Sequence, residues 1–199
     1  MEAFEILVSP AARRPMADVD TDRILPAKRM KGLTRNGLGA FLFERMRYDD
    51  AGRARPAFVL NRPEFRDARI LVAGANFGCG SSREHAVWAL KDHGIRCIIA
   101  PSFGSIFAGN CRENGILLIA LPENALAALD ARLDETPTAA LTVDLRAQTI
   151  VVDGGAPIPF DIDPPVRRHL MDGRDSVERT LALEGAIADY EERRALEWV

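Results

Sequence analysis

The residues best suited to chemistry form one glycine-punctuated segment, Gly78-Cys79-Gly80-Ser81-Ser82-Arg83-Glu84. This segment lies between an apolar run at 69–73 and a helical pattern at 83–93, so we expect it to lead into a helix N-terminus. Backbone N–H groups point outward there, and the helix dipole favours an anion. The two glycines allow a ligand to approach the backbone closely, and Arg83 can grip a carboxylate with two hydrogen bonds. The pattern indicates an anion site for a carboxylate or a phosphate.

The same segment also fits a purely structural role. The residues Ser81-Ser82-Arg83-Glu84 have the pattern of a capping box, in which Ser81 caps the helix and Glu84 reaches back. On the residues alone, capping is as well supported as a functional site. The segment is not a dinucleotide fingerprint, because a third glycine is missing at the required offset. It is not a Walker A loop either, because no Gly-Lys-Ser/Thr comes after it.

Two charged segments lie upstream. Asp18-Val19-Asp20-Thr21-Asp22 resembles the start of a calcium loop, but Arg23 and Arg29 occupy the places where an EF-hand needs glycine and glutamate. We therefore interpret it as an acidic turn that caps the residues immediately after it. The segment 28–35 carries four positive charges around two apolar side chains. It fits either a solvated basic loop or a loop that recognises an anionic substrate with an apolar branch.

Composition and charge exclude several classes of protein. The chain has 199 residues, 47% hydrophobic and 28% charged, which is the balance of an ordinary globular protein. A formal charge of −3, without a basic stripe among aromatics, argues against a nucleic-acid partner. No apolar run approaches the ~20 residues needed to cross a bilayer, so no membrane association is expected. The N-terminus also lacks the profile of a signal peptide, so a cytoplasmic location is expected.

The cysteines and histidines predict neither a cluster nor a structural zinc in this chain. Cys79, Cys97 and Cys111 are an odd set, which fits a reducing compartment, and their spacing matches no CxxC pair or ferredoxin-type run. Cys79 is interpreted as loop packing, because no histidine is placed by sequence to activate it. A histidine such as His85, on the first turn of a helix, is more often a capping or packing residue than a ligand.

The elements that must position the glycine segment alternate between strand and helix. Three apolar runs predict buried strands, at 69–73, 95–100 and 116–121. Two helical patterns lie between them, at 83–93 and 102–114. Such alternation favours parallel pairing. A β-hairpin is expected from 140–144 and 149–153. The stretch 176–198 is expected to be helical, with an apolar stripe that includes Ile187 and Tyr190. We therefore expect an α/β fold with a mixed sheet.

One eleven-residue stretch, 76–86, closely resembles the signature of the swivelling domain of the aconitase superfamily. Its Asn-Phe-Gly-Cys-Gly form is similar to that of the separate small subunits of 3-isopropylmalate dehydratase of the bacterial type. The stretches 18–26 and 101–110 and the tail resemble the same family, so the likeness covers essentially the whole chain. It implies a single swivelling β/β/α domain over residues 1–199, with a partly open mixed β-barrel, flanking helices and a helical C-terminal tail.

The resemblance also implies a reaction shared between two chains. In this family a large subunit holds a [4Fe–4S] cluster whose exposed iron acts as a Lewis acid on the substrate hydroxyl, and the small subunit carries no cofactor. The implied reaction is dehydration of a dicarboxylate, 2-isopropylmalate, to 2-isopropylmaleate and rehydration to 3-isopropylmalate, a step of leucine biosynthesis. By motif position, Ser81 corresponds to the serine base that takes the carbon-bound proton. Arg83 corresponds to the residue that binds a substrate carboxylate, and Ser82 adds hydrogen bonds.

The basic loop matches the region where this family recognises the side group of the substrate. By that resemblance, Met30 or Leu33 would meet the isopropyl group, and Arg29 or Lys31 a carboxylate. Two alternatives remain open. The chain could be the small subunit of a related hydro-lyase that acts on methylmalate, dimethylmalate or homoaconitate. It could instead be a stand-alone anion-binding module that needs no cluster-bearing partner.

Overall fold

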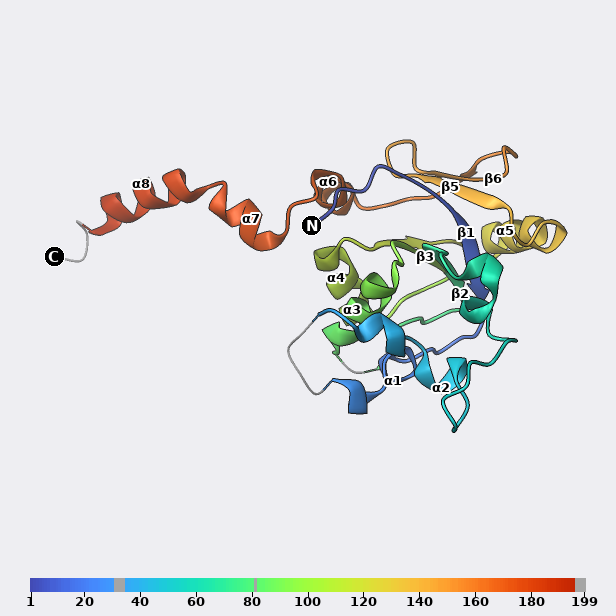
Figure 1. The fold of residues 1–199 in the computed structure, drawn as a ribbon. Coiled ribbons are helices and arrows are strands. Elements are labelled where there is room, and N and C mark those ends of the chain that lie inside the picture. The colour runs from blue at the N-terminus through green and yellow to red at the C-terminus, as the bar shows by residue number, and fades with distance from the viewer. Residues whose placement is uncertain (31–34, 81, 196–199) are drawn as a thin grey trace.

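A computed structural model describes residues 1–30, 35–80 and 82–195 of the chain (Figure 1). In this part of the chain, seven strands form one mixed sheet in the order β4-β3-β2-β1-β5-β6-β7. The strands are β1 (Ile6–Arg14), β2 (Ile70–Ala73), β3 (Cys97–Ala100), β4 (Leu117–Ala120), β5 (Ala140–Asp144), β6 (Thr149–Val152) and β7 (Ile158–Pro159). Strands β1 to β4 are parallel, and β5, β6 and β7 continue the sheet antiparallel. The sheet curls into a half-barrel, so the expected α/β fold with a partly open mixed barrel is confirmed.

Strand β1 joins the two halves of the sheet by changing its partner along its length. Its first part, Ile6 to Pro10, pairs with β5, and its second part, Ala11 to Arg14, pairs with β2. Because β1 leaves β5 after Pro10, the sheet opens between β5 and β2 beside the last residues of β1. The sequence patterns did not predict this central strand.

Helices cover both faces of the curled sheet. The α-helices are α1 (Thr21–Ile24), α2 (Glu44–Arg47), α3 (Glu84–His93), α4 (Ser105–Asn114), α5 (Glu123–Glu135), α6 (Pro164–Asp172), α7 (Ser176–Leu181) and α8 (Glu184–Ala195). Four 3-10 turns accompany them, η1 (Ala27–Arg29), η2 (Leu38–Phe41), η3 (Val59–Asn61) and η4 (Pro63–Phe65). No helix in the part of the chain that is described is long and apolar enough to cross a membrane.

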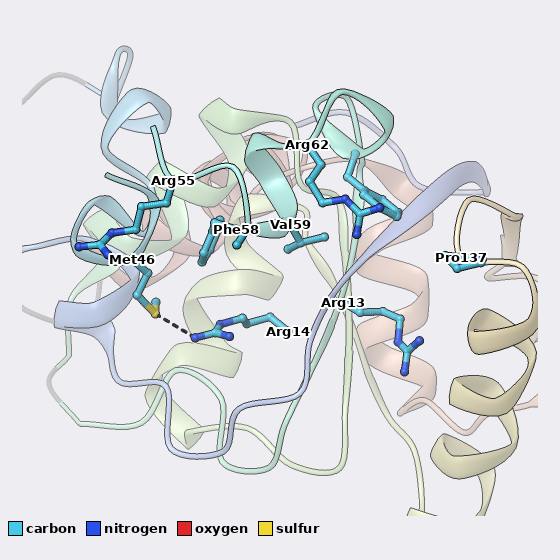
Figure 2. A pocket seen from close by; sticks show the side chains of 10 residues that line it. Arg13, Arg14, Met46, Arg55, Phe58, Val59, Arg62 and Pro137 are labelled. Carbon is cyan, nitrogen blue, oxygen red and sulfur yellow. Dashed lines mark hydrogen bonds between the residues drawn. The ribbon is translucent and has the colours of Figure 1, made fainter. Parts of the chain in front are cut away.

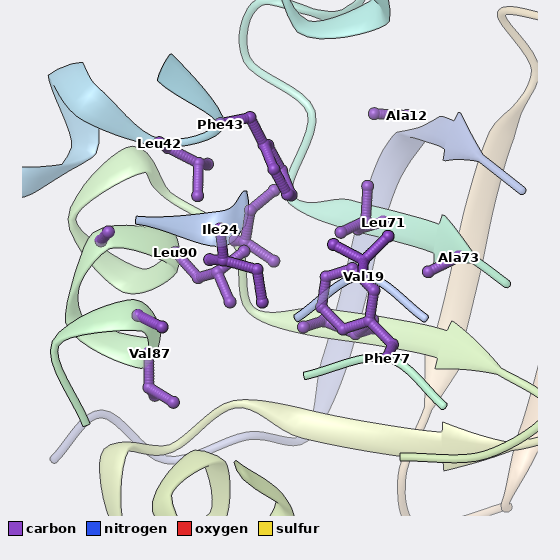
Figure 3. Close-up of a cluster of buried hydrophobic side chains, with 14 of the residues drawn as sticks. Ala12, Val19, Ile24, Leu42, Phe43, Leu71, Ala73, Phe77, Val87 and Leu90 are labelled. Atoms are coloured by element: carbon purple, nitrogen blue, oxygen red, sulfur yellow. The ribbon is translucent and has the colours of Figure 1, made fainter. Parts of the chain in front are cut away.

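The buried side chains form two hydrophobic clusters, one on each face of the parallel strands. The first lies against α3, α4 and the segments 24–30 and 38–68 (Figure 3), and the second against α5, α6 and strands β5 to β7. Strand β2 supplies Leu71 and Ala73 to the first cluster and its other two residues to the second. A strand buried on both faces must be apolar throughout, which is why a continuous apolar run predicts it correctly.

The predicted elements around the glycine segment are confirmed, with small shifts at their ends. The three predicted strands form β2, β3 and β4, and the hairpin forms β5 and β6. Helix α3 ends at Gly94 and α4 at Gly115, both in the left-handed conformation that suits glycine. Helix α4 begins at Ser105 instead of Ser102, because the residues before it pair with the loop that comes after β2.

The prediction that the C-terminal stretch is helical is confirmed for the residues of it that the structure describes. Two helices, α7 and α8, occupy this stretch, and Figure 1 shows them extending away from the body of the molecule. Ile187 and Tyr190 do not pack as a stripe, because their side chains are 39% and 52% exposed. Periodicity predicted helix here correctly, but it does not show what a helix packs against.

The loops after β1 and β2 are tied together by backbone hydrogen bonds. The Gly78 N–H donates to the Val19 carbonyl over 2.8 Å, and the Thr21 N–H donates to the Cys79 carbonyl over 3.1 Å. Asp20 and Cys79 form a parallel bridge between these bonds. The acidic turn and the glycine segment therefore run side by side.

The loop after β3 is tied to the same segment from its other side. The Phe77 N–H donates to the Ser102 carbonyl over 3.1 Å, and the Gly104 N–H donates to the Phe77 carbonyl over 2.9 Å. Three loops thus meet at the carboxyl ends of β1, β2 and β3. This edge is where open sheets with parallel strands bind their ligands.

The approach of these loops leaves no room for a side chain at Gly78. Its φ is +74°, and a Cβ atom built there would lie 2.2 Å from the ring of Phe107. A Cβ atom at Gly104 would lie 2.6 Å from the Gly78 carbonyl oxygen. Glycine is therefore required at both positions for the three loops to meet.

We expect Gly78→Ala to lower the free energy of unfolding by about 2 kcal/mol or more, because it combines overpacking with an unfavourable left-handed backbone. Gly109→Ala in α4 is the matched control, because no atom of the described residues outside the backbone of α4 itself lies within 4 Å of a Cβ built there. It should raise stability by about 0.5–1 kcal/mol, as alanine does in a helix interior. Urea denaturation measures both. Equal midpoints for Gly78→Ala and wild type would contradict this account of the loop.

Candidate active site

Arg83 stands at the start of α3, where the glycine segment ends. It is the N-cap residue, with φ −108° and ψ 98°, and its side chain makes no capping bond. The predicted capping box is wrong, because Glu84 is the first residue of the helix and a capping box needs it at the third. The Glu84 carboxylate instead accepts hydrogen bonds from Trp88 Nε1 at 3.1 Å and Asn114 Nδ2 at 2.8 Å, and so links α3 to α4.

Asp22 on α1 holds the guanidinium of Arg83. Its Oδ1 accepts from Arg83 Nη1 over 3.1 Å and from the Ala27 N–H over 2.9 Å, and its Oδ2 lies 2.8 Å from Arg45 Nη1. The hydrogen bond from the Ala27 N–H, and next the bond from Arg83 and the charge of Arg45, hold the pKa of Asp22 below its usual value against the opposing effect of burial. Asp22 therefore stays ionised at neutral pH and fixes where Arg83 lies.

The rest of the acidic turn shapes the backbone around this contact. The Asp20 side chain caps α1 by accepting from the Arg23 N–H over 2.8 Å. Asp18 Oδ1 accepts from Asn76 Nδ2 over 2.8 Å. The interpretation of this stretch as a turn that caps the residues after it is confirmed. Its other two carboxylates, those of Asp18 and Asp22, bond to Asn76, just before the glycine segment, and to Arg83.

Arg29 is paired with Glu44 on α2. Its Nε and Nη2 lie 3.1 and 2.6 Å from the two Glu44 carboxylate oxygens, and its guanidinium lies 4.0 Å from the centre of the Phe41 ring. Lys28 Nζ lies 3.3 Å from the same carboxylate. The hydrogen bond from Arg29 lowers the pKa of Glu44. Arg29 thus holds one end of the basic loop on α2.

The remaining predicted site residues are placed only in part. Met30 is partly buried and packs against the first hydrophobic cluster, and Ser82 is exposed. Ser81, Lys31 and Leu33 lie outside the residues that the structure describes.

Helix α2 connects the two groups of predicted residues. Its first residue, Glu44, binds Arg29, and its second, Arg45, binds the Asp22 that holds Arg83. Sequence reasoning missed Glu44 and Arg45, because a four-residue helix carries no periodicity. It saw Asp22 only as part of an acidic turn, since nothing in the sequence pairs it with an arginine 61 positions away.

The cysteines and His85 do not form a nucleophilic or metal site. Burial first, and then the charges of Asp18 and Asp20, raise the pKa of the Cys79 thiol. The other two cysteines are fully buried. The ring of His85 packs 4.5 Å from that of Trp88, measured between centroids. Among the described residues, no group of three or more His, Cys, Asp or Glu could hold a metal ion.

We expect Asp22→Asn to make the stability of the fold less dependent on pH. The folded-state pKa of Asp22 is below the usual value of 3.8, so its stabilising effect is complete above that value and is lost as the pH falls through the lowered pKa. The variant should be less stable than wild type at pH 7, and the difference should shrink below about pH 4. Urea unfolding across this pH range measures it. A difference that stays constant down to the lowest pH would contradict the role of the Asp22 charge.

Comparisons with known proteins agree with this architecture over nearly the whole chain. The family model described as Aconitase C-terminal domain matches residues 1–124, and the model LeuD_N matches residues 127–164. The 3-isopropylmalate dehydratase small subunit of Rhodospirillum centenum is 51% identical and covers 99% of this chain and 97% of its own length. That of Roseobacter denitrificans is 49% identical, over 98% of this chain and 97% of its own.

A solved structure shows the same fold. The crystal structure of 3-isopropylmalate dehydratase from Methanocaldococcus jannaschii matches with a TM-score of 0.67 and 26% identity, over 94% of this chain and 99% of that one. Identity near 50% along almost the full length, together with this shared half-barrel, leaves one assignment: the chain belongs to the aconitase-related family of 3-isopropylmalate dehydratase small subunits.

Proposed function

We propose that this chain is the small subunit of a hydro-lyase that interconverts 2-isopropylmalate and 3-isopropylmalate through 2-isopropylmaleate in leucine biosynthesis. The observation that carries the proposal is the 51% identity, over 99% of the chain, to a relative that bears the name of this enzyme's small subunit. The site adds a chemical reason, because an arginine fixed at a helix N-terminus suits a dicarboxylate substrate.

We further infer that a large-subunit partner carries the [4Fe–4S] cluster. The described residues of this chain do not fit such a group, because Cys97 and Cys111 are fully buried and no set of donors converges. A cluster on the partner would supply a Lewis acid for the substrate hydroxyl. The free cysteines support a reducing compartment, and we propose the cytoplasm.

Arg83 would bind a substrate carboxylate. One of its terminal nitrogens donates to Asp22, which leaves its other N–H groups for the ligand. Because Asp22 already fixes the guanidinium, little side-chain entropy remains to be lost when substrate binds. Ser82, exposed beside it, would add a hydrogen bond to the same carboxylate.

Ser81 would act as the base. Its Oγ, as an alkoxide, would take the carbon-bound proton of the substrate, and would return it during rehydration. A serine hydroxyl is a weak acid in water, so its alkoxide needs stabilisation. The N-terminus of α3 and the positive charge of Arg83 would supply it at a site from which water is excluded.

The basic loop would recognise the side group of the substrate. Met30 or Leu33 would meet the isopropyl branch, and Lys31 or Arg29 the second carboxylate. To bind the substrate, Arg29 would release the Glu44 carboxylate and bind a substrate carboxylate in its place. Because Arg45 on α2 also pairs with Asp22, this change of partner would affect the position of Asp22 and, through it, of Arg83.

Anaerobic co-purification with the large subunit, followed by an absorbance assay of alkene formation from several malate analogues, tests the proposed function. Preferred turnover of isopropylmalate supports it. Preferred turnover of methylmalate, dimethylmalate or homoaconitate would contradict the substrate and assign the chain to a related hydro-lyase. No complex and no turnover, with ligand binding by the isolated chain, would favour an anion-binding module.

We expect Ser81→Ala to lower kcat by about 10²- to 10⁴-fold, the usual contribution of a general base, and to leave assembly with the large subunit intact. Ser105→Ala, an exposed serine at the start of a different helix, is the matched control and should retain wild-type turnover. Size-exclusion chromatography checks assembly. Near-wild-type turnover of Ser81→Ala in the assembled enzyme would reject the base.

We expect Arg83→Lys mainly to raise the KM for isopropylmalate, because an ammonium keeps the charge but cannot reproduce the two-pronged grip on a carboxylate. Arg66→Lys, at an exposed arginine, is the control for the same chemical change elsewhere. Steady-state kinetics of the assembled enzyme measures both. If KM and kcat are unchanged in Arg83→Lys, Arg83 does not bind the substrate.

A further inference from the structure

A cationic pocket of about 500 Å³ opens where β1 leaves β5 and pairs with β2 (Figure 2). Four arginines line it, Arg13, Arg14, Arg55 and Arg62, and none of the other lining residues that the structure describes is acidic. The remaining wall is largely apolar and includes Phe58, Val59 and Phe65. A concave site of this size, with an apolar wall and a few polar groups, is typical of small-molecule pockets.

Arg14 is the cation in this pocket that most needs a ligand. Its Nη2 lies 3.6 Å from Met46 Sδ and 3.9 Å from Met16 Sδ, and sulfur is a weak acceptor. Its guanidinium lies 5.7 Å from the centre of the Phe58 ring. Among the described residues, its buried Nε has no hydrogen-bond partner, and no carboxylate forms an ion pair with it. A partly buried guanidinium without a counter-charge is unfavourable, and a bound anion would relieve it.

The other arginines do not cancel this charge. Arg13 forms ion pairs with Asp130 and Asp134, which leaves its own charge neutralised. Arg55 donates its Nε to the carbonyl oxygen of Tyr48 at 2.9 Å, and the nearby Asp49 carboxylate interacts with its charge.

Arg62 has only a solvent-exposed partner for its charge. Its guanidinium lies 3.4 Å from an exposed carboxylate, that of Glu64, and such a surface pair contributes little. Arg14 is therefore the lining arginine whose charge no carboxylate of the described residues pairs with.

We propose that this pocket binds a small organic anion that has one carboxylate and a short hydrocarbon part. The guanidinium of Arg14 takes the carboxylate, and the side chains of Phe58 and Val59 cover the hydrocarbon part. The apolar wall decides against a bare inorganic anion, which would leave that wall without a contact. This assignment does not rest on the proposed dehydratase activity, because it involves none of the residues used there.

NMR titration of the full chain tests the proposal, with the arginine Nε–H and backbone amide resonances as the readout. Isovalerate is the probe, isoamyl alcohol is its uncharged analogue, and sulfate is an anion without the hydrocarbon part. We expect saturable shifts centred on Arg14 and its pocket with isovalerate, and at least tenfold weaker binding of the other two.

Variants distinguish binding in the pocket from nonspecific attraction of the anion to positive charge elsewhere on the surface. Arg14→Gln should weaken isovalerate binding at least tenfold, and Arg14→Lys should weaken it less because it keeps the charge. Arg66→Gln removes an exposed arginine outside the pocket and should bind as wild type does. Retained amide spectra show that the variants fold. Equal binding of isovalerate and either control ligand, or unchanged binding in Arg14→Gln, would overturn the proposal.

Discussion

The glycine segment can cross the carboxyl edge of the sheet only because Gly78 has no side chain. Its backbone lies so close to Phe107 that a Cβ atom would fall 2.2 Å from the ring, and a Cβ atom at Gly104 would fall 2.6 Å from the Gly78 carbonyl oxygen. This contact lets the loops after β1, β2 and β3 share backbone hydrogen bonds. Everything at the site is built on that edge. The acidic turn lies along one side of the glycine segment. At its end, Arg83 leads this segment into α3.

Ion pairs connect the predicted site residues to one another. Asp22 joins Arg83 to Arg45, and the residue before Arg45 on α2, Glu44, holds Arg29. The loop that would recognise the side group and the arginine that would bind a carboxylate are therefore connected through one short helix. Such preorganisation favours binding, because the side chains are placed before the ligand arrives. It also means that a change on α2 would affect both groups.

The sequence predicts strands β2, β3 and β4 and helix α3 well, because buried strands must be apolar and glycines mark where the helices end. It fails where structure depends on contacts distant in sequence. Strand β1 was not predicted because Pro10 interrupts the strand pattern in the sequence and because Ile6 and Val8 are exposed, so no continuous buried run marks it. The capping box fails because Glu84 begins the helix and binds across to α4. The resemblance of the stretch 76–86 to a family signature singled out Arg83. Its partner on α1, Asp22, becomes visible only in the fold.

The most direct test of the account is the distance from the Arg83 guanidinium to a carboxylate of a competitive dicarboxylate inhibitor, in a crystal structure of the two-subunit complex. The account predicts a two-pronged contact with N···O distances of about 2.7–3.2 Å, while Arg83 keeps its hydrogen bond to Asp22. An inhibitor whose carboxylates lie beyond about 4 Å from Arg83 would contradict the claim that Asp22 positions this arginine to bind substrate.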